Sequence, residues 1–306
     1  MNYGLSQDQM GVLDGLERLI ASASPPVPTK PMAFSYAADL DAAIAKAGFY
    51  DIAREEGFGP LDAALVVERL ARLPHALEAG ASCLIAPALS LPSLSRPIAL
   101  MRGAVPGAAR FLPMARVLIW DRGCDAVAVR IEKPNVESLD TLFAYPYGRL
   151  RSTKGIELVA VKDLPMLRRR WRVALAVEAA GAMAAALAVV IEHVKTRQAF
   201  GRPLGAFQAL QHRLAIAAET AESAKWLSFR AAWSDKDSDA TVALGFAQSR
   251  INPLTFDLHQ FCGAMGLTLE FPLHHWTYRL RAIAGELGGA REQTRAAALE
   301  TWPAAS

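Results

Sequence analysis

Residues 195–212 read KTRQAFGRPLGAFQALQH in one-letter code and separate two long apolar segments. Gly201 and Pro203 lie in the middle of this stretch, where glycine readily ends a helix and proline cannot continue one. The pattern therefore predicts that one helix ends before Gly201 and that a second begins near Gln208. Such a corner can present a cation, Arg197, and an amide, Gln208, to a ligand.

The segments around this corner have the apolar period of helices. Leu210, Leu214, Ala217 and Ala221 recur at i, i+4, i+7 and i+11 and form one apolar stripe. Four helices are predicted for this half of the chain, over residues 166–197, 208–234, 240–265 and 272–300. Because alanine-rich faces let helices approach closely, an antiparallel four-helix bundle is the natural packing.

Residues 173–191 are the most apolar part of the chain, and Glu178 is their only charge. A membrane-spanning helix contains about 20 strongly apolar residues, and a carboxylate near its centre costs about 2.5–3.5 kcal/mol. Since this segment is mostly alanine, we interpret it as a buried helix of a globular protein. A helix that is apolar all round needs burial on every side, which favours the bundle as the main oligomer interface.

The sequence before the bundle divides into two regions. Residues 1–86 carry helical periodicity, interrupted by prolines that predict an extended connector, namely Pro25, Pro26, Pro28 and Pro31. Residues 87–165 carry short β-branched runs that predict a hairpin over 116–131 and a further strand over 156–161.

We therefore expect an α+β protein that is mainly α. Its predicted parts are an N-terminal helical domain over residues 1–86, a reduced β-domain over 87–165 and a C-terminal four-helix bundle over 166–306.

Composition narrows the class of protein. The 306 residues are 52% hydrophobic and 21% charged, which is enough to bury a large core. A net charge of +3 indicates neither a nucleic-acid nor a membrane surface. The three cysteines lack the spacing of a disulfide framework or of a metal site, and no signal peptide is visible, so a cytoplasmic location is expected.

Residues 259–274 read HQFCGAMGLTLEFPLH and form a second informative stretch. Gly263 and Ala264 are small enough to allow close backbone approach to a pyrophosphate. With the corner at residues 195–212, in this order and at this separation, the stretch resembles the flavin-binding signature of acyl-CoA dehydrogenases. Residues 47–49 and 55–59 also match the family pattern. The resemblance covers about the first 85 and the last 140 residues.

The resemblance implies that FAD binds across a subunit interface. Carried over to this sequence, Arg197 pairs with the pyrophosphate, Phe200 packs on the cofactor and Gln208 bonds near the adenine. An arginine suits this role because its donors form a fixed fork. Without the resemblance, Arg197 is interpreted as a cation that the helix dipole favours at a helix C-terminus. Gln208 is then interpreted as a polar residue at a helix start.

The second stretch supplies the other implied cofactor contacts, since Gln260, Gly263 and Ala264 would line the pyrophosphate. The implied reaction is α,β-desaturation of an acyl-CoA thioester. The family also implies an electron-transfer flavoprotein as the electron acceptor.

The family's catalytic base is missing from this sequence. A glutamate removes the proton beside the thioester carbonyl, and the family places it at one of two positions. These positions hold Trp171 and Leu287 here, and residues 87–165 contain nothing like the family's Thr-Glu-Pro…Gly-Ser loop that binds the flavin ring. This pattern resembles the short subunit of heterotetrameric bacterial acyl-CoA dehydrogenases of sterol or bile-acid side-chain degradation. The resemblance implies a partner subunit that carries the base.

Several charged residues have a second interpretation. Glu178 could act as a base through a raised pKa, or it could be bonded to a neighbouring helix. Glu286, next to Leu287, is the other candidate acid. Arg172 matches a family arginine near the substrate, and the adjoining Arg168–Arg170 could hold CoA phosphates or form a solvated helix start. The histidines His259, His274 and His275 are not at metal-ligand spacing.

Two further functions stay open at this point. A homo-oligomeric acyl-CoA dehydrogenase could use Glu178 or Glu286 as an unconventional base. Alternatively, a non-catalytic scaffold could have kept the fold and lost FAD.

Overall fold

The computed structural model of the chain describes residues 4–27, 36–89, 91, 94–132, 135–152 and 158–302. Its N-terminal part consists of α1 (Gln7–Ala23), α2 (Ala38–Lys46) and α3 (Pro60–Ala71), with short helical turns η1 (Phe49–Arg54), η2 (Ala81–Ile85) and η3 (Ala86–Ala88). Pro25 and Pro26 follow the end of α1, as predicted for a connector. Pro28 and Pro31 lie outside the described residues.

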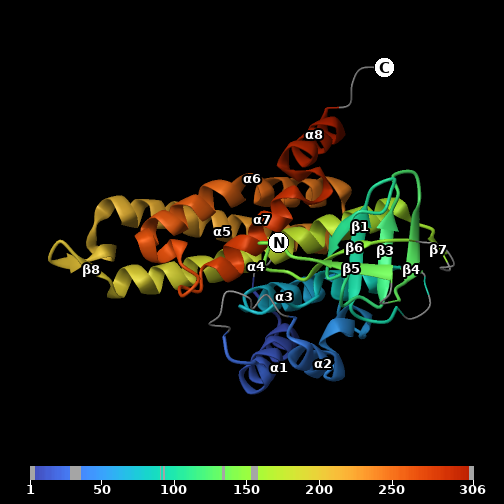
Figure 1. The fold of residues 1–306 in the computed structure, drawn as a ribbon, viewed down its shortest axis with the longest axis horizontal. Helices are drawn as coiled ribbons and strands as arrows, with labels where there is room; N and C mark the ends of the chain where they lie inside the picture. Colours follow the sequence, from blue (N-terminus) through green and yellow to red (C-terminus); the bar gives the residue numbers. More distant parts are fainter. Residues whose placement is uncertain are drawn as a thin grey trace.

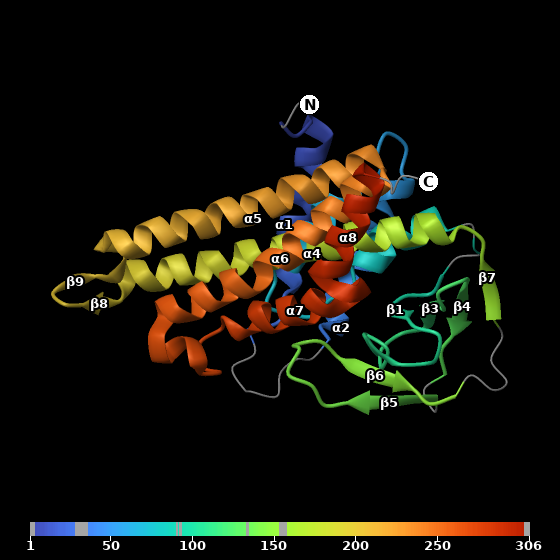
Figure 2. The same cartoon turned by 90° about the horizontal axis from the view of Figure 1, so that it is seen from above.

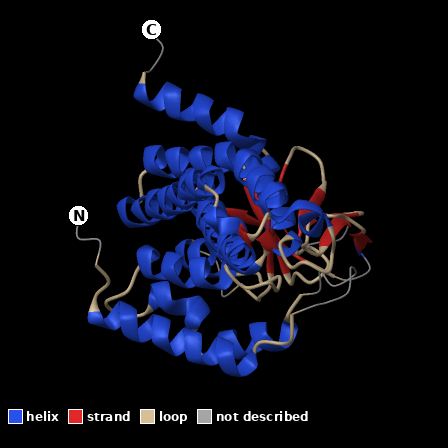
Figure 3. Ribbon diagram, turned by 90° about the vertical axis from the view of Figure 1, so that its left-hand side faces the viewer, coloured by secondary structure: helices blue, strands red, loops and turns tan. Residues whose placement is uncertain are grey.

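The strands gather on one side of the helices (Figure 3). One sheet has the order β1-β3-β4-β7, made of β1 (Ile98–Arg102), β3 (Val117–Asp121), β4 (Ala126–Arg130) and β7 (Leu158–Val161). The other has the order β2-β6-β5, made of β2 (Ala108–Arg110), β6 (Tyr147–Leu150) and β5 (Val136–Leu139).

The predicted hairpin is confirmed, because β3 and β4 pair antiparallel with Ile119 opposite Ala128. The strand expected over 156–161 is β7 in its described part, and residues 156 and 157 lie outside the described residues.

Three long helices form the bundle and run along the length of the molecule (Figures 1 and 2). They are α4 (Leu164–Thr196), α5 (Gln208–Ser234) and α6 (Asp237–Cys262), close to the predicted bounds. The corner between α4 and α5 holds the two-residue strands β8 (Gln198–Ala199) and β9 (Arg202–Pro203) and the turn η5 (Leu204–Ala206). This corner lies at one end of α4, and the two sheets lie at its other end.

The fourth predicted helix is wrong as a single element. The chain over 272–300 forms α7 (His274–Gly285), the turn η7 (Glu286–Gly288) and α8 (Gly289–Thr301). Leu287, Gly288 and Gly289 have φ angles of 52°, 88° and 68°, so three successive residues leave the right-handed helical region.

Side chains from α6 and α8 stabilise this break. Gln248 donates to the carbonyls of Ile283 (2.8 Å) and Glu286 (2.9 Å). Gln293 donates to the Leu287 carbonyl at 2.8 Å. The carbonyls that a continuous helix would pair internally are thus bonded by amides from two other helices.

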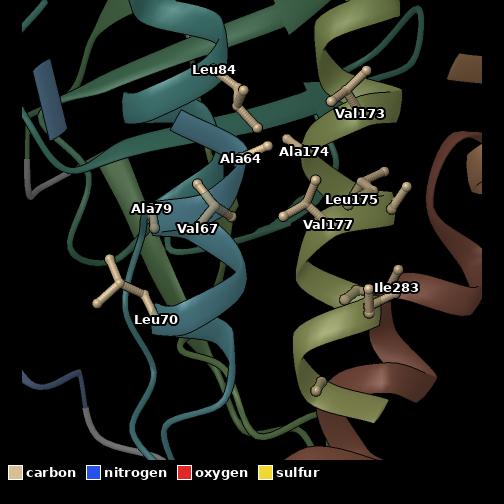
Figure 4. Close-up of a cluster of buried hydrophobic side chains, with 14 of the residues drawn as sticks. Ala64, Val67, Leu70, Ala79, Leu84, Val173, Ala174, Leu175, Val177 and Ile283 are labelled. Carbon is tan, nitrogen blue, oxygen red and sulfur yellow. The ribbon is translucent and has the colours of Figure 1, made fainter. Parts of the chain in front are cut away.

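Helices α3 and α4 pack directly on one another in the core, where Val67 and Val177 point toward each other (Figure 4). The two helices approach closely at Gly181, where an added Cβ would collide with the Glu68 carbonyl and lie 2.8 Å from Ala71 Cβ. The helical periodicity predicted within residues 1–86 is confirmed at α3, where Ala63, Val66, Val67 and Leu70 are buried. The expected class, mainly α with a small β region, is also confirmed.

Helix α4 is long and apolar enough to cross a membrane by length and composition alone, and 72% of its most apolar window is buried inside this chain. Helices α3, α5, α6 and α7 cover it. It is therefore the central helix of the core, as interpreted from residues 173–191. Because the chain itself supplies this burial, the apolar character of α4 does not by itself require a partner.

Candidate functional site

A pocket of about 470 Å³ lies at the end of the bundle that carries the α4–α5 corner. Arg197 from the first stretch and Gln260, Gly263 and Ala264 from the second all line it. Residues more than 60 positions apart in the sequence therefore meet at one place, because α4 and α6 end side by side. Leu204, Leu210 and Phe261 supply an apolar wall.

Arg197 is the residue that follows α4, where its backbone N–H donates to the His193 carbonyl at 2.9 Å. Its own carbonyl accepts from the Leu204 N–H at 2.9 Å, which closes the corner. Within the described part of the chain, no carboxylate forms an ion pair with its exposed side chain. The guanidinium is thus held at a pocket wall and is available to an anion.

Gly263 leaves the backbone accessible at another part of the pocket wall. Its φ of 57° is in the left-handed half of conformational space, and no heavy atom lies within 4 Å of the position where a Cβ would be. It follows the last residue of α6, at the start of the turn η6 (Gly263–Leu267). The bare backbone at this point leaves room for a bulky anion to approach.

Phe200 and Gln208 lie beside the pocket rather than in its wall. Phe200 is at the tip of the β8–β9 hairpin, has a φ of 52° and is 92% exposed. Its ring packs edge-on against Phe207 with a centroid distance of 6.1 Å. Gln208 is the first residue of α5 and is exposed. In this chain neither side chain contacts the groups that line the pocket at Arg197.

Two pocket residues were missed by the sequence reasoning. His193 lies one turn before Arg197, and both burial and the charge of Arg197 lower the pKa of its imidazole. Arg213 lies in the second turn of α5 and forms an ion pair with Asp257 on α6. Helical spacing was the available signal, because a residue about one turn away from a motif residue lies on the same face of its helix.

A second pocket, of about 430 Å³, lies between the sheets and the C-terminal helices. Trp171 and Leu287, which occupy the two positions where the family has its base, both line it. Glu286 and Arg110 lie in the same wall. The structure thus brings together two positions that are far apart in sequence, and neither carries a carboxylate.

The two candidate acids are tied to one buried arginine. Arg110, on β2, bonds Glu178 through Nη1 at 2.7 Å and forms an ion pair through Nε with Glu286. Burial raises the pKa of Glu178, and the charge of Arg110 opposes that rise. Gly80 approaches the other carboxylate oxygen so closely that an added Cβ would collide with it.

A second buried arginine completes this cluster. Arg279 donates to the backbone carbonyls of His75 (3.1 Å), Leu73 (2.7 Å) and His275 (2.6 Å). Its guanidinium and that of Arg110 lie 6.0 Å and 4.9 Å from the ring centroid of Tyr145. Two arginine and two glutamate side chains therefore meet in this cluster and balance in formal charge.

The arginines at the start of α4 are also paired. Arg168 makes two 2.8 Å bonds to Asp121, and Arg169 and Arg170 both bond Asp235. They are therefore neither a solvated helix start nor cations free of carboxylates.

Arg172 takes a different partner, since its Nε donates to Gln293 Oε1 at 2.9 Å. It thereby orients the amide that holds the Leu287 carbonyl. Arg172 does not line either of the two pockets described above.

The histidines bond protein groups. His259 Nδ1 lies 2.6 Å from the Gly266 carbonyl, and its Nε2 lies 3.0 Å from the Thr277 hydroxyl. His274 Nδ1 lies 2.8 Å from the Phe271 carbonyl. These contacts place His259 and His274 in the packing of α6 against α7.

Sequence comparison assigns the bundle. Residues 169–300 match the acyl-CoA dehydrogenase C-terminal domain. The bundle is an acyl-CoA dehydrogenase C-terminal domain. The recognition of this family from residues 195–212 and 259–274 is thereby confirmed. The chain is 30% identical to acyl-CoA dehydrogenase FadE34 of Mycobacterium tuberculosis over 198 residues. This alignment covers 61% of this chain and 27% of that protein. The chain spans less than half the length of the next two curated relatives as well.

Solved acyl-CoA dehydrogenase structures share the whole fold. A chain of the ChsE4–ChsE5 complex from Mycobacterium tuberculosis superposes with a TM-score of 0.84 at 18% identity, covering 100% of both chains. A chain of the steroid ACAD Tcur3481–Tcur3483 superposes with a TM-score of 0.78 at 18% identity, covering 95% of this chain and 96% of that one. At these identities the likeness is one of fold.

Proposed function

We propose that this chain is a subunit of a flavin-dependent acyl-CoA dehydrogenase that desaturates an acyl-CoA thioester between Cα and Cβ. In this proposal it contributes the ADP half of an FAD site at a subunit interface, and a partner subunit contributes the catalytic base. The observation that carries the proposal is the separation of the two pockets. One is lined by residues of the two flavin-binding stretches and the other by Trp171 and Leu287, and they lie at opposite ends of α4.

Helix geometry makes this separation large. Trp171 lines the pocket between the sheets and the C-terminal helices, which we call the junction pocket. Arg197 lines the pocket at the end of the bundle, which we call the bundle-end pocket, and lies 26 residues further along the chain. At 1.5 Å per residue this is about 40 Å along the axis, which is further than one dinucleotide reaches. A cofactor whose diphosphate lies at Arg197 must therefore place its ring against another chain.

The bundle-end pocket has the chemistry of a dinucleotide diphosphate site. It combines the unpaired guanidinium of Arg197, the open backbone at Gly263, the amide of Gln260 and an apolar wall. Arg197 and Gln260 would hold the diphosphate, and Leu210 and Phe261 would pack against the nucleoside. When bound, FAD supplies the hydride acceptor for the substrate's β-carbon.

The junction pocket supports placing the base on a partner. Trp171 and Leu287 cannot accept a proton, and Glu178 and Glu286 are both engaged by Arg110. At Glu178 the charge of Arg110 opposes the rise in pKa that burial causes, so this contact makes the carboxylate a weaker base than a buried acid without a partner would be. These ion pairs disfavour a self-sufficient enzyme that uses Glu178 or Glu286.

The substrate and partner classes come from the fold relatives. One of the structures with the same fold is by its name a complex of two chains, ChsE4 and ChsE5, and another is called a steroid ACAD. We extend this to a heterotetramer of two long and two short chains that acts on the acyl-CoA of a sterol or bile-acid side chain, in the cytoplasm. An electron-transfer flavoprotein is the proposed electron acceptor.

Colour and turnover test the proposal. The chain is expressed alone and together with the product of the adjacent gene, and flavin absorbance and bleaching by a steroid-side-chain acyl-CoA are measured. We expect a colourless lone chain and a yellow, active complex. Flavin and activity in the lone chain would instead support a homo-oligomeric enzyme, and no flavin in either preparation would support a scaffold.

A further inference from the structure

The bundle-end pocket contains a second guanidinium, that of Arg213, which belongs to neither flavin-binding stretch as quoted. Arg213 Nε lies 3.3 Å from Asp257 Oδ2, and its Nη2 contacts Asp257 Oδ1. Its guanidinium also lies over the Phe261 ring, 5.2 Å from the centroid. A carboxylate on one side and an aromatic face on the other fix the orientation of this side chain at the pocket wall.

The pairing leaves part of the guanidinium free. Asp257 engages Nε and Nη2, and within the described part of the chain Nη1 has no hydrogen-bond partner. The Arg213 side chain is 44% exposed, against 24% for that of Asp257. Because the donors of an arginine form a planar fork, one edge can hold a carboxylate while the remaining donors bind a phosphate.

The negative charge of a diphosphate provides a physical reason for a second cation in this pocket. A diphosphate linking two nucleosides carries two negative charges, and Arg197 alone offsets one of them. Arg213 lines the same pocket from the next helix, so the two guanidiniums approach one volume from two walls.

We propose that Arg213 is a second cation for the diphosphate of a dinucleotide, and that Asp257 is a positioning residue that holds its guanidinium at the pocket wall. This inference rests on the proposed function, because it takes the pocket to hold such a diphosphate. Asp257 acts through Arg213 and does not contact the ligand.

The chain offers a matched control for this ion pair. Arg230 and Asp239 also join α5 to α6, at 3.2 Å, and the Arg230 side chain is 59% exposed. Neither lines the bundle-end pocket. A change at this second ion pair alters the same two helices and the same net charge without touching the pocket.

The test measures equilibrium binding of FAD and of ADP to the full chain, purified with its partner, across a series of salt concentrations. Thermal unfolding of each variant serves as the folding check. Arg213→Ala is expected to weaken FAD binding about ten- to a hundred-fold, the range for a charge-assisted contact, and to reduce its salt dependence. Asp257→Asn is expected to weaken it several-fold, and Asp257→Glu to restore it. Arg230→Ala and Asp239→Asn should leave it unchanged.

The other outcomes would contradict the role of Arg213, the role of Asp257 or the cofactor assignment. Unchanged binding in Arg213→Ala, with Arg197→Ala still weakened, overturns this inference and leaves the proposed function standing. Tighter binding in Asp257→Asn shows that the carboxylate only repels the anion and overturns its positioning role. Binding unaffected by both Arg197→Ala and Arg213→Ala, or absent from the wild-type complex, overturns the cofactor assignment and this inference together.

Discussion

Arg197 joins the sequence signature to a physical role, because it ends α4 at a pocket wall and no described carboxylate neutralises it. Replacing Arg197 with Ala should therefore remove one charge-assisted contact to the diphosphate. The expected loss is about 1.5–3 kcal/mol of binding, or roughly ten- to a hundred-fold in FAD affinity. Equilibrium FAD binding by the assembled complex measures it, with thermal unfolding as the control because folding should survive. Unchanged FAD retention would remove the main support for the assignment.

His193 makes the same pocket sensitive to pH. Burial and the charge of Arg197 both lower the pKa of its imidazole below the ordinary 6.5. The unfolded chain therefore takes up a proton at higher pH than the folded chain, so stability falls as the pH drops below about 6.5. Arg197→Ala should raise the His193 pKa, and so should bound ADP, because one removes a cation and the other adds an anion.

A histidine-resolved NMR titration of wild type, Arg197→Ala and the ADP complex measures this directly. His212 is exposed and outside the pocket, and its titration is the internal control. A His193 titration that is the same in all three samples would place the imidazole away from the diphosphate.

Glu178 is expected to be structural. Glu178→Gln leaves part of the charge of Arg110 uncompensated in a buried place, and breaking such a pair costs about 3–5 kcal/mol. The variant should thus unfold at a lower temperature, while flavin bleaching by acyl-CoA in the assembled complex falls only a few-fold. Removing a true base costs about 10² to 10⁴-fold.

Single-turnover bleaching at matched FAD content distinguishes the two roles of Glu178, and Glu286→Gln is measured in the same way. Glu17→Gln, which loosens the exposed pair with Arg69, is the control for unfolding. A fall beyond about a hundred-fold for Glu178→Gln or Glu286→Gln, with FAD bound, would mean that this chain carries its own base.

At the scale of elements, the contact between α3 and α4 depends on Gly181. Alanine normally favours a helix by about 1 kcal/mol over glycine, yet a Cβ at this position would collide with the Glu68 carbonyl of α3. We expect Gly181→Ala to be destabilising by about 1–3 kcal/mol through overpacking. Gly11→Ala on α1, where a Cβ would meet no atom within 4 Å, should be stabilising instead. Denaturant unfolding of both variants tests the sign, and equal stabilisation would contradict the close approach.

At the scale of the whole molecule, the two pockets at opposite ends of α4 determine how many flavins an assembly holds. In the proposed arrangement, each copy of this chain contributes one diphosphate pocket and the partner contributes the base. The complex should therefore bind one FAD for each pair of unlike chains. Flavin absorbance against total polypeptide measures this ratio, and solution scattering should show an assembly. One FAD per polypeptide, or a stable monomer, would contradict the proposed arrangement.

Exposed apolar side chains of the bundle, rather than the apolar character of α4, support an assembly. Ile216 on α5 is 60% exposed and Phe256 on α6 is 66% exposed. Large apolar side chains left open on adjacent helices are typical of surfaces that meet another chain.

Local signals in the sequence were enough for the long helices, the corner at Gly201 and the β3–β4 hairpin. Each of these depends on residues close together in the chain, where period, glycine and proline act directly on the backbone. The same signals predicted one helix over 272–300, because they give no warning that Gln248 from α6 and Gln293 from within this segment would bond the carbonyls at a break at Leu287.

Only the tertiary structure decided which charges meet. It paired Glu178 and Glu286 with Arg110, placed Arg213 and His193 beside Arg197, and set the two pockets at opposite ends of α4. Glu178 and Glu286 lie 68 and 176 positions from Arg110, and no periodicity links them to it. Their meeting depends on the fold that brings β2 to α4 and η7, since a buried charge is stable only where the fold brings it a partner.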